Sequence, residues 1–211
     1  MTEAAAPGRT GRPKSEQKAE AILLAASERF LSKGFQGTSM DAVAQRAGVS
    51  KQTVYSHFAN KEELFKACIH AKVAGYGFDE TTTVDARDLR TALMKVARRF
   101  VDLLLDPEVV AMHRVVMGEA TSQPRIAALF FDSGPKRTKA AVCAFLQQQV
   151  DAGRLAIAQD RLLYAAVQLL NMAIGMYQLQ LLLCLRDAVD EAEINAQIEH
   201  AVDDFLRLYA V

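Results

Sequence analysis

A run of polar side chains in the first third of the sequence could do chemistry of a particular kind. Lys51, Gln52 and Thr53 supply, in order, an ammonium group, an amide, and a hydroxyl beside a methyl group. Lysine can donate to O6 and N7 of guanine, glutamine can pair with adenine, and the threonine methyl can contact the methyl group of thymine. These groups could read base edges in the major groove of DNA, although they would equally suit a solvated helix face.

Apolar residues around this run predict two short helices joined by a tight turn. Met40, Val43 and Ala44 begin an i, i+3, i+4, i+7 repeat, which predicts a helix at about residues 39–46 with one apolar face. Gly48 follows it, where a left-handed residue ends a helix. Ser50 can cap the next helix, at about residues 50–57.

In that second helix only Val54, with Phe58 four residues later, is expected to point inward. The polar and aromatic residues are left facing out: Lys51, Gln52, Thr53, Tyr55, Ser56 and His57. A short helix that is held by its neighbour and carries such a face suits a DNA major groove.

Four motifs follow one another here: Thr-Ser-Met at 38–40, Ala-Gly-Val-Ser at 47–50, Thr-Val-Tyr-Ser-His-Phe at 53–58 and Asn-Lys-Glu-Glu-Leu-Phe at 60–65. Together they resemble the DNA-binding domain of TetR/AcrR transcriptional regulators, over about residues 15–69. Two later motifs, Val-Met-Gly-Glu-Ala-Thr at 116–121 and Phe-Phe-Asp-Ser-Gly-Pro-Lys-Arg at 130–137, resemble the AefR-type C-terminal regulatory domain.

The resemblance implies particular contacts with DNA. Residues that match Tyr55 and His57 touch the phosphate backbone in the family, and Lys61 matches a phosphate clamp. Thr38 and Ser39 can cap the first of the two helices, and they can also present its N-terminus to a phosphate. The predicted DNA-binding residues of this region are therefore Thr38, Ser39, Ser50, Lys51, Gln52, Thr53, Tyr55, Ser56, His57 and Lys61.

Residues 1–14 form a basic arm in which glycines and Pro13 disfavour a helix. Arg9, Arg12 and Lys14 give this arm its charge. A solubilising tail and an arm that reaches the adjacent minor groove are both compatible with these residues.

The composition predicts an all-α protein. The 211 residues are 51% hydrophobic and 24% charged, with 5 prolines and 11 glycines, and no strand-like alternation is visible. We expect about nine helices. A helix-turn-helix three-helix domain would occupy residues 15–72, and a helical bundle for ligand binding and dimerisation would occupy residues 73–211.

The formal net charge is zero, yet the charges are unevenly distributed. Residues 1–72 contain eleven Lys and Arg against seven Asp and Glu, whereas the remainder contains fourteen against eighteen. The part that carries the motifs is therefore the basic one, as a DNA-binding segment requires.

Several classes of function find no support in the sequence. Cys68, Cys143 and Cys184 stand alone, no pair of His or Cys has metal-ligand spacing, and no nucleophile-elbow, phosphate-loop or dinucleotide motif occurs. We therefore expect no enzyme activity, no metal and no cofactor. No clean run of about 18 apolar residues is present, so no membrane span is expected. The isolated cysteines favour a reduced, cytoplasmic setting, and the family resemblance implies a bacterial protein associated with the nucleoid.

Beyond the DNA-binding segment, helices are expected at about residues 88–105, 107–120, 124–152, 160–185 and 190–210, with a bend in the third at Gly134-Pro135. Gly75 and Gly77 leave two alternatives for the helix that starts at Asn60. It ends near Tyr76 in an ordinary way, or it has a kinked end that takes part in switching.

The larger apolar side chains of these later helices are either simple core or the lining of an adaptable pocket. The family places its inducer pocket among them, which gives as candidates Phe100, Met112, Met117, Phe130, Phe131, Phe145, Asn171, Met172 and Met176. The family also dimerises through its last two helices, which gives as interface candidates Ala173, Gly175, Ile198, Val202 and Phe205.

We therefore interpret the sequence as a homodimeric repressor that binds a (pseudo)palindromic operator in double-stranded DNA and is released by a small apolar effector. A helical-bundle enzyme that converts small molecules is one alternative, but it lacks candidate catalytic groups. An activator with the same fold is another, and an interaction module with a vestigial helix-turn-helix is a third.

Overall fold

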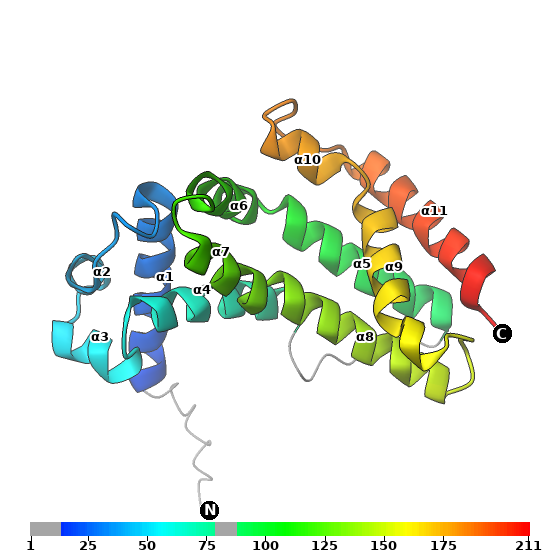
Figure 1. Cartoon of the computed structure of the whole chain (residues 1–211), viewed down its shortest axis with the longest axis horizontal. Coiled ribbons are helices and arrows are strands. Elements are labelled where there is room, and N and C mark those ends of the chain that lie inside the picture. Colours follow the sequence, from blue (N-terminus) through cyan, green and yellow to red (C-terminus); the bar gives the residue numbers. More distant parts are fainter. Residues whose placement is uncertain (1–13, 79–87) are drawn as a thin grey trace, which may run out of the picture. The chain divides into compact units, whose positions relative to one another are not determined.

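The computed structural model describes residues 14–78 and 88–211, and within these ranges it contains helices and no strand (Figure 1). The predicted all-α fold is thus confirmed. The chain divides into two compact units, one ending at Phe65 and one spanning Lys66–Val211. The boundary falls inside α4 (Lys61–Gly75), which is one continuous helix.

The first unit contains α1 (Lys14–Lys33), α2 (Met40–Ala47), α3 (Lys51–His57) and the start of α4. Its centre is an aromatic cluster of Phe30, Phe35 and Phe65, whose ring centroids lie 5.1–5.8 Å apart. Val43 of α2 and Val54 of α3 are fully buried in the same core. Each burial of a side chain of this size stabilises the fold by roughly 1.5–3 kcal/mol.

Local signals set the ends of these helices as predicted. Gly48 has a φ of +65°, and its N–H donates to the carbonyl of Gln45 while the N–H of Val49 donates to that of Ala44. This is the pattern of a helix end with a left-handed residue, which glycine adopts without strain. Asn60 caps α4, because its side-chain oxygen accepts from the N–H of Glu63 at 2.9 Å.

The second unit is a helical bundle. After α4 it contains α5 (Leu89–Leu105), α6 (Pro107–Glu119), α7 (Pro124–Ser133), α8 (Pro135–Asp151), the 3-10 helix η1 (Gln159–Arg161), α9 (Leu162–Ile174), α10 (Tyr177–Leu182) and α11 (Glu191–Tyr209). Helix α9 packs against α5, α8 and α11, and α11 packs against α5 (Figure 1). The core between them is built from fully buried side chains such as Leu93, Leu146, Leu169, Val202 and Phe205.

Two long helices expected from the sequence are each divided in the structure. The predicted helix 124–152 is α7 and α8, because Gly134 has non-helical angles (φ −115°, ψ −84°) and Pro135 begins a new helix. The predicted helix 160–185 is η1, α9 and α10, because Gly175 has a φ of +52°, which a right-handed helix cannot contain.

Of the two alternatives for the end of α4, the structure has the ordinary helix end. The helix ends at Gly75, and Gly77 has a φ of +77°, so the chain leaves the helix there. A Cβ atom on Gly77 would also lie 3.2 Å from the guanidinium of Arg99. Glycine is required at 77 and not at 75, where a Cβ atom would meet open space.

Within the described ranges, no helix combines the length and the apolar character that crossing a membrane requires.

Candidate nucleic-acid interface

Helix α3 is held by capping hydrogen bonds at both ends and by one buried side chain on its inner face. Its N-cap is Ser50, whose Oγ accepts from the N–H of Thr53 at 3.1 Å. The N–H of Phe58 donates to the carbonyl of Val54 at 2.9 Å and closes the last turn. Because Val54 is fully buried, the opposite face of α3 is directed outward.

That outward face carries the polar groups predicted for it. Lys51, Gln52 and Ser56 are exposed, and the ring of Tyr55 is 46% exposed. Thr53 and His57 are half-buried at its edges. The structure therefore brings an ammonium, an amide, hydroxyls and an aromatic ring together on one short helix, and their contact with DNA stays a prediction.

Lys51 is oriented by a neighbour that the sequence analysis missed. Its Nζ lies 2.8 Å from Oδ1 of Asp41 on α2 and 6.0 Å from the ring centroid of Tyr55. The hydrogen bond and the charge of Asp41 raise the pKa of Lys51, so the side chain stays cationic. Both partners are exposed, so the pair is a weak restraint that a phosphate or a base could replace.

Hydroxyl groups at the start and end of α3 already have partners within the chain. The Oγ of Ser50 and Oγ1 of Thr53 lie 2.8 Å apart, and Oγ of Ser56 donates to the carbonyl of Thr53 at 2.8 Å. A hydroxyl that donates internally can still accept, so Ser56 remains able to receive a hydrogen bond from DNA.

At the start of α2 the two predicted residues have different positions. Ser39 is the N-cap, and its Oγ accepts from the N–H of Ala42 at 3.2 Å. Thr38 is only 2% exposed, and its hydroxyl donates to the carbonyl of Gly34 at 2.8 Å. The side chain of Thr38 thus stabilises the α1–α2 connection, and Ser39 is the residue at the exposed helix end.

Lys61 also has an internal role. Its Nζ donates to the carbonyl oxygens of Phe35 and Thr38 at 2.7 and 2.9 Å, and lies 4.3 Å from the ring centroid of Phe35. The side chain is half-buried. In the structure this ammonium group holds the connection between α1 and α2. The phosphate contact expected of Lys61 stays a prediction.

The basic arm cannot be placed in the same way. Arg9 and Arg12 lie outside the described residues, and Lys14 is the first residue of α1. The minor-groove contact expected of this arm stays a prediction.

The candidate pocket residues are scattered through the second unit. Met112 and Phe145 are buried and Phe100, Phe130 and Met172 are half-buried, whereas the remaining four are exposed: Met117, Phe131, Asn171 and Met176. None of the nine lines the cleft of about 490 Å³ that the structure contains beside α5 and α11. A shared pocket for them stays a prediction.

The candidate interface residues lie mostly in the core of the single chain. Ala173, Ile198, Val202 and Phe205 are at most 1% exposed, and Gly175 forms the break after α9. Since burial is complete without a second chain, these four side chains leave no surface for a partner. The exposed apolar residues of the same two helices are Leu163, Tyr164 and Leu208.

The second unit and the first unit each match a family model. Residues 22–68 match a model described as bacterial regulatory proteins of the tetR family, and residues 91–211 match the C-terminal domain of AefR-like transcriptional repressors. This chain belongs to the TetR family of transcriptional regulators. It is a DNA-binding regulator, and the resemblance seen in its motifs is confirmed.

Relatives of this TetR-family regulator differ in what they do. The HTH-type transcriptional activator FasR of Mycolicibacterium smegmatis is 30% identical over 168 residues, which cover 71% of this chain and 76% of FasR. The structure of the flavonoid-responsive regulator FrrA matches with a TM-score of 0.73 and 33% identity, over 92% of this chain and 98% of FrrA. A TetR-family regulator from Mesorhizobium loti matches with a TM-score of 0.77 and 28% identity, over 95% and 100%.

The part of the chain that the structure describes contains no group of three or more His, Cys, Asp or Glu arranged to hold a metal ion.

Proposed function

We propose that this TetR-family regulator is a repressor that binds a (pseudo)palindromic operator as a homodimer through the exposed face of α3. The observation that carries the proposal is the construction of that helix. Buried Val54 and the Ser50 cap fix it, while Lys51, Gln52 and Tyr55 remain on its outer face. A repressor, as opposed to an activator, is favoured by the match of residues 91–211 to AefR-like transcriptional repressors.

A homodimer is favoured by exposed apolar side chains on the last two long helices. On α9, Leu163 and Tyr164 are both 59% exposed, and on α11 Leu208 is 58% exposed. Helix α9 is apolar on its outer side as well as its inner side, which is typical of a helix covered on both sides. A second copy would supply that cover, and it would add a second α3 for a half-site about one DNA turn away.

Release by a small, largely apolar molecule is the third part of the proposal. One similar protein supports regulation by such a ligand, because FrrA is a flavonoid-responsive regulator. A ligand can release the operator only if it binds the two conformations of the dimer with different affinities.

An activator is the second candidate, and the similarity to FasR favours it. A mobility-shift assay on the DNA upstream of the protein's own gene, with a scrambled duplex as control, tests binding. Transcript levels with and without the gene then separate the two roles. Deletion of the gene raises transcription of the target if the protein is a repressor. It lowers transcription of the target if the protein is an activator. A failure to bind any duplex better than the scrambled one would contradict both.

A further inference from the structure

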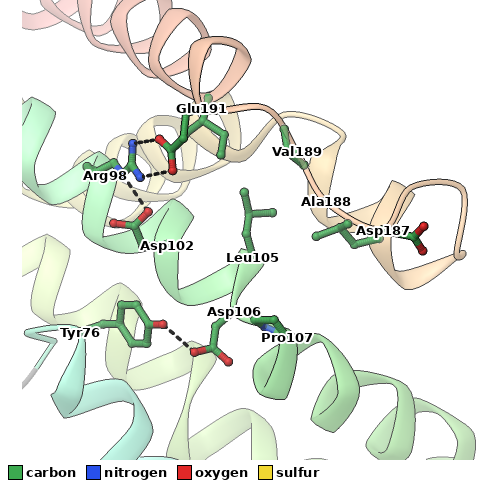
Figure 2. A pocket seen from close by; sticks show the side chains of 12 residues that line it. Tyr76, Arg98, Asp102, Leu105, Asp106, Pro107, Asp187, Ala188, Val189 and Glu191 are labelled. Atoms are coloured by element: carbon green, nitrogen blue, oxygen red, sulfur yellow. Dashed lines mark hydrogen bonds and ion pairs between the residues drawn. The ribbon is translucent and has the colours of Figure 1, made fainter.

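An open cleft of about 490 Å³ lies in the second unit where α5 ends (Figure 2). Its walls come from the last turns of α5, the α5–α6 corner, α10, the segment before α11 and the first turn of α11. Tyr76, just after α4, completes the lining. The volume falls within the range of about 300–1,000 Å³ that small-molecule sites occupy.

One part of the lining is apolar. Leu181 and Ile194 are buried, and Leu105 and Val189 are half-buried beside them. Figure 2 shows Leu105 and Val189 approaching the cleft from different elements, α5 and the segment before α11. An apolar ligand body would be removed from water against these side chains, which favours binding.

The other part of the lining is acidic. The lining contains four carboxylates, of Asp102, Asp106, Asp187 and Glu191, and one guanidinium, that of Arg98. Arg98 is occupied, because its nitrogens donate to Glu191 at 2.7 and 3.0 Å and to Asp102 at 2.7 Å. Lys72 does not line the cleft and is shared between Asp106 and Glu108. The lining itself carries an excess of three negative charges.

Helix α5 increases this negative character. It ends at Leu105 with no basic residue in its last turn, and the carboxyl end of a helix carries partial negative charge. A cation is thus favoured here by the side chains and by the backbone, whereas an anion is disfavoured by both.

We propose that this cleft binds a small amphiphile with an ammonium head and an apolar body, and that such a molecule is the effector. The inference rests on the proposed function in one respect, namely that the regulator responds to a ligand. The charge complementarity of the cleft specifies the class of ligand.

Asp106 connects the cleft to α4. One carboxylate oxygen caps α6 by accepting from the N–H groups of Glu108 and Val109 at 2.8 and 3.1 Å. The other accepts from the hydroxyl of Tyr76 at 2.6 Å (Figure 2). It also lies 2.9 Å from Nζ of Lys72. An ammonium group that binds this oxygen would compete with Tyr76 and Lys72, both near the end of α4.

The ionisation states fit this arrangement. Burial and the hydrogen bond to Asp106 raise the pKa of Tyr76 to about 12, so the phenol remains a donor at neutral pH. Burial alone would raise the pKa of Asp106, but hydrogen bonds from Tyr76 and Lys72 outweigh it and lower the pKa. The carboxylate is therefore ionised, and a cation reaches it by displacing Tyr76 or Lys72.

The test is titration calorimetry of the full-length protein, without DNA, against three probes of equal chain length: octylammonium, octanoate and 1-octanol. Asp106→Asn and Asp187→Asn each remove one charge from the cleft. Asparagine can still cap α6, and Asp187 is exposed, so both variants should fold. Glu199→Gln removes an exposed charge of α11 that does not line the cleft and serves as the control.

We expect octylammonium to bind more tightly than the other two probes. Asp106→Asn should weaken it about fivefold, the effect of one charge about 4 Å away in water. Asp187→Asn should weaken it less, because this exposed carboxylate lies away from Asp106 (Figure 2), and Glu199→Gln should not weaken it. Hydrogen exchange of residues 72–78 should accelerate when octylammonium binds. Preference for octanol or octanoate, equal weakening by the control, or no binding of octylammonium would each overturn the proposal. Operator binding by the wild type without a probe is measured separately, so a failure of the proposed function would be recognised on its own.

Discussion

Replacement of Lys61 by methionine separates a structural role from a DNA-binding role. Methionine keeps most of the apolar stem and removes the ammonium group. In the structure that group donates two hydrogen bonds, to the carbonyls of Phe35 and Thr38, and lies over the ring of Phe35. The substitution therefore releases the connection between α1 and α2 from the start of α4.

The size of the effect follows from these contacts. A hydrogen bond from a charged donor contributes about 1.5–3 kcal/mol. The carbonyl of Phe35 still accepts from the N–H of Thr38 at 3.3 Å, so it keeps one partner. The half-burial of Lys61 also places it between exposed and core sites. We expect Lys61→Met to lower the free energy of unfolding by about 2–3 kcal/mol.

Urea unfolding of the full-length protein measures this loss, with Lys51→Met as a matched control. Lys51 is an exposed lysine on α3 whose loss should change stability little. The salt dependence of DNA binding gives the second comparison. It should become shallower by about 1 for Lys51→Met and stay unchanged for folded Lys61→Met. Unchanged stability of Lys61→Met, together with a shallower salt dependence, would refute the structural role and support the phosphate clamp.

Three further predictions concern the second unit. Gly75→Ala should stabilise the protein by up to about 1 kcal/mol, and Gly77→Ala should destabilise it by about 1 kcal/mol or more; thermal unfolding of the two single variants distinguishes them. Leu163→Glu should give a folded monomer, seen by light scattering with circular dichroism, and a soluble dimer would remove α9 from the interface. Because the pKa of Tyr76 is raised to about 12, its contribution is complete below the unfolded pKa of about 10 and is lost as pH rises to about 12. Tyr76→Phe should remove this alkaline loss of about 1–2 kcal/mol, after allowance for partial exposure.

The DNA-binding helices could be predicted in detail because their signals are local. Gly48, Ser50 and Asn60 act on backbone groups two to four residues away, so their types and spacing were sufficient. Buried Val54 followed from the same short-range periodicity.

Features that depend on distant residues could not be predicted. Lys61 meets carbonyls 23 and 26 residues earlier, which no local pattern reveals. Gly175 lies in a continuous apolar stretch, where only the packing of the bundle decides that its φ is positive. Apolarity alone also did not distinguish residues buried within one chain, such as Phe205, from exposed ones such as Leu163.

The cleft is the extreme case, because Tyr76, Asp106 and Glu191 line one cleft only when α4, α5 and α11 pack together. In the sequence, Asp187 is an ordinary charge before a helix and Glu191 is an ordinary charge in its first turn. A signal that could have indicated the site is the absence of basic residues in the last turn of α5 beside Asp102 and Asp106.

Reading of DNA by the exposed face of α3 is tested most directly by selecting bound sequences from randomised duplexes. The wild type should enrich two inverted half-sites with centres about one helical turn apart. Gln52→Ala should lose preference at one position in each half-site, and Tyr55→Ala should weaken all sequences to a similar degree while its melting temperature stays unchanged. Identical preferences and affinities for the wild type and both variants would show that another surface of the protein reads the DNA.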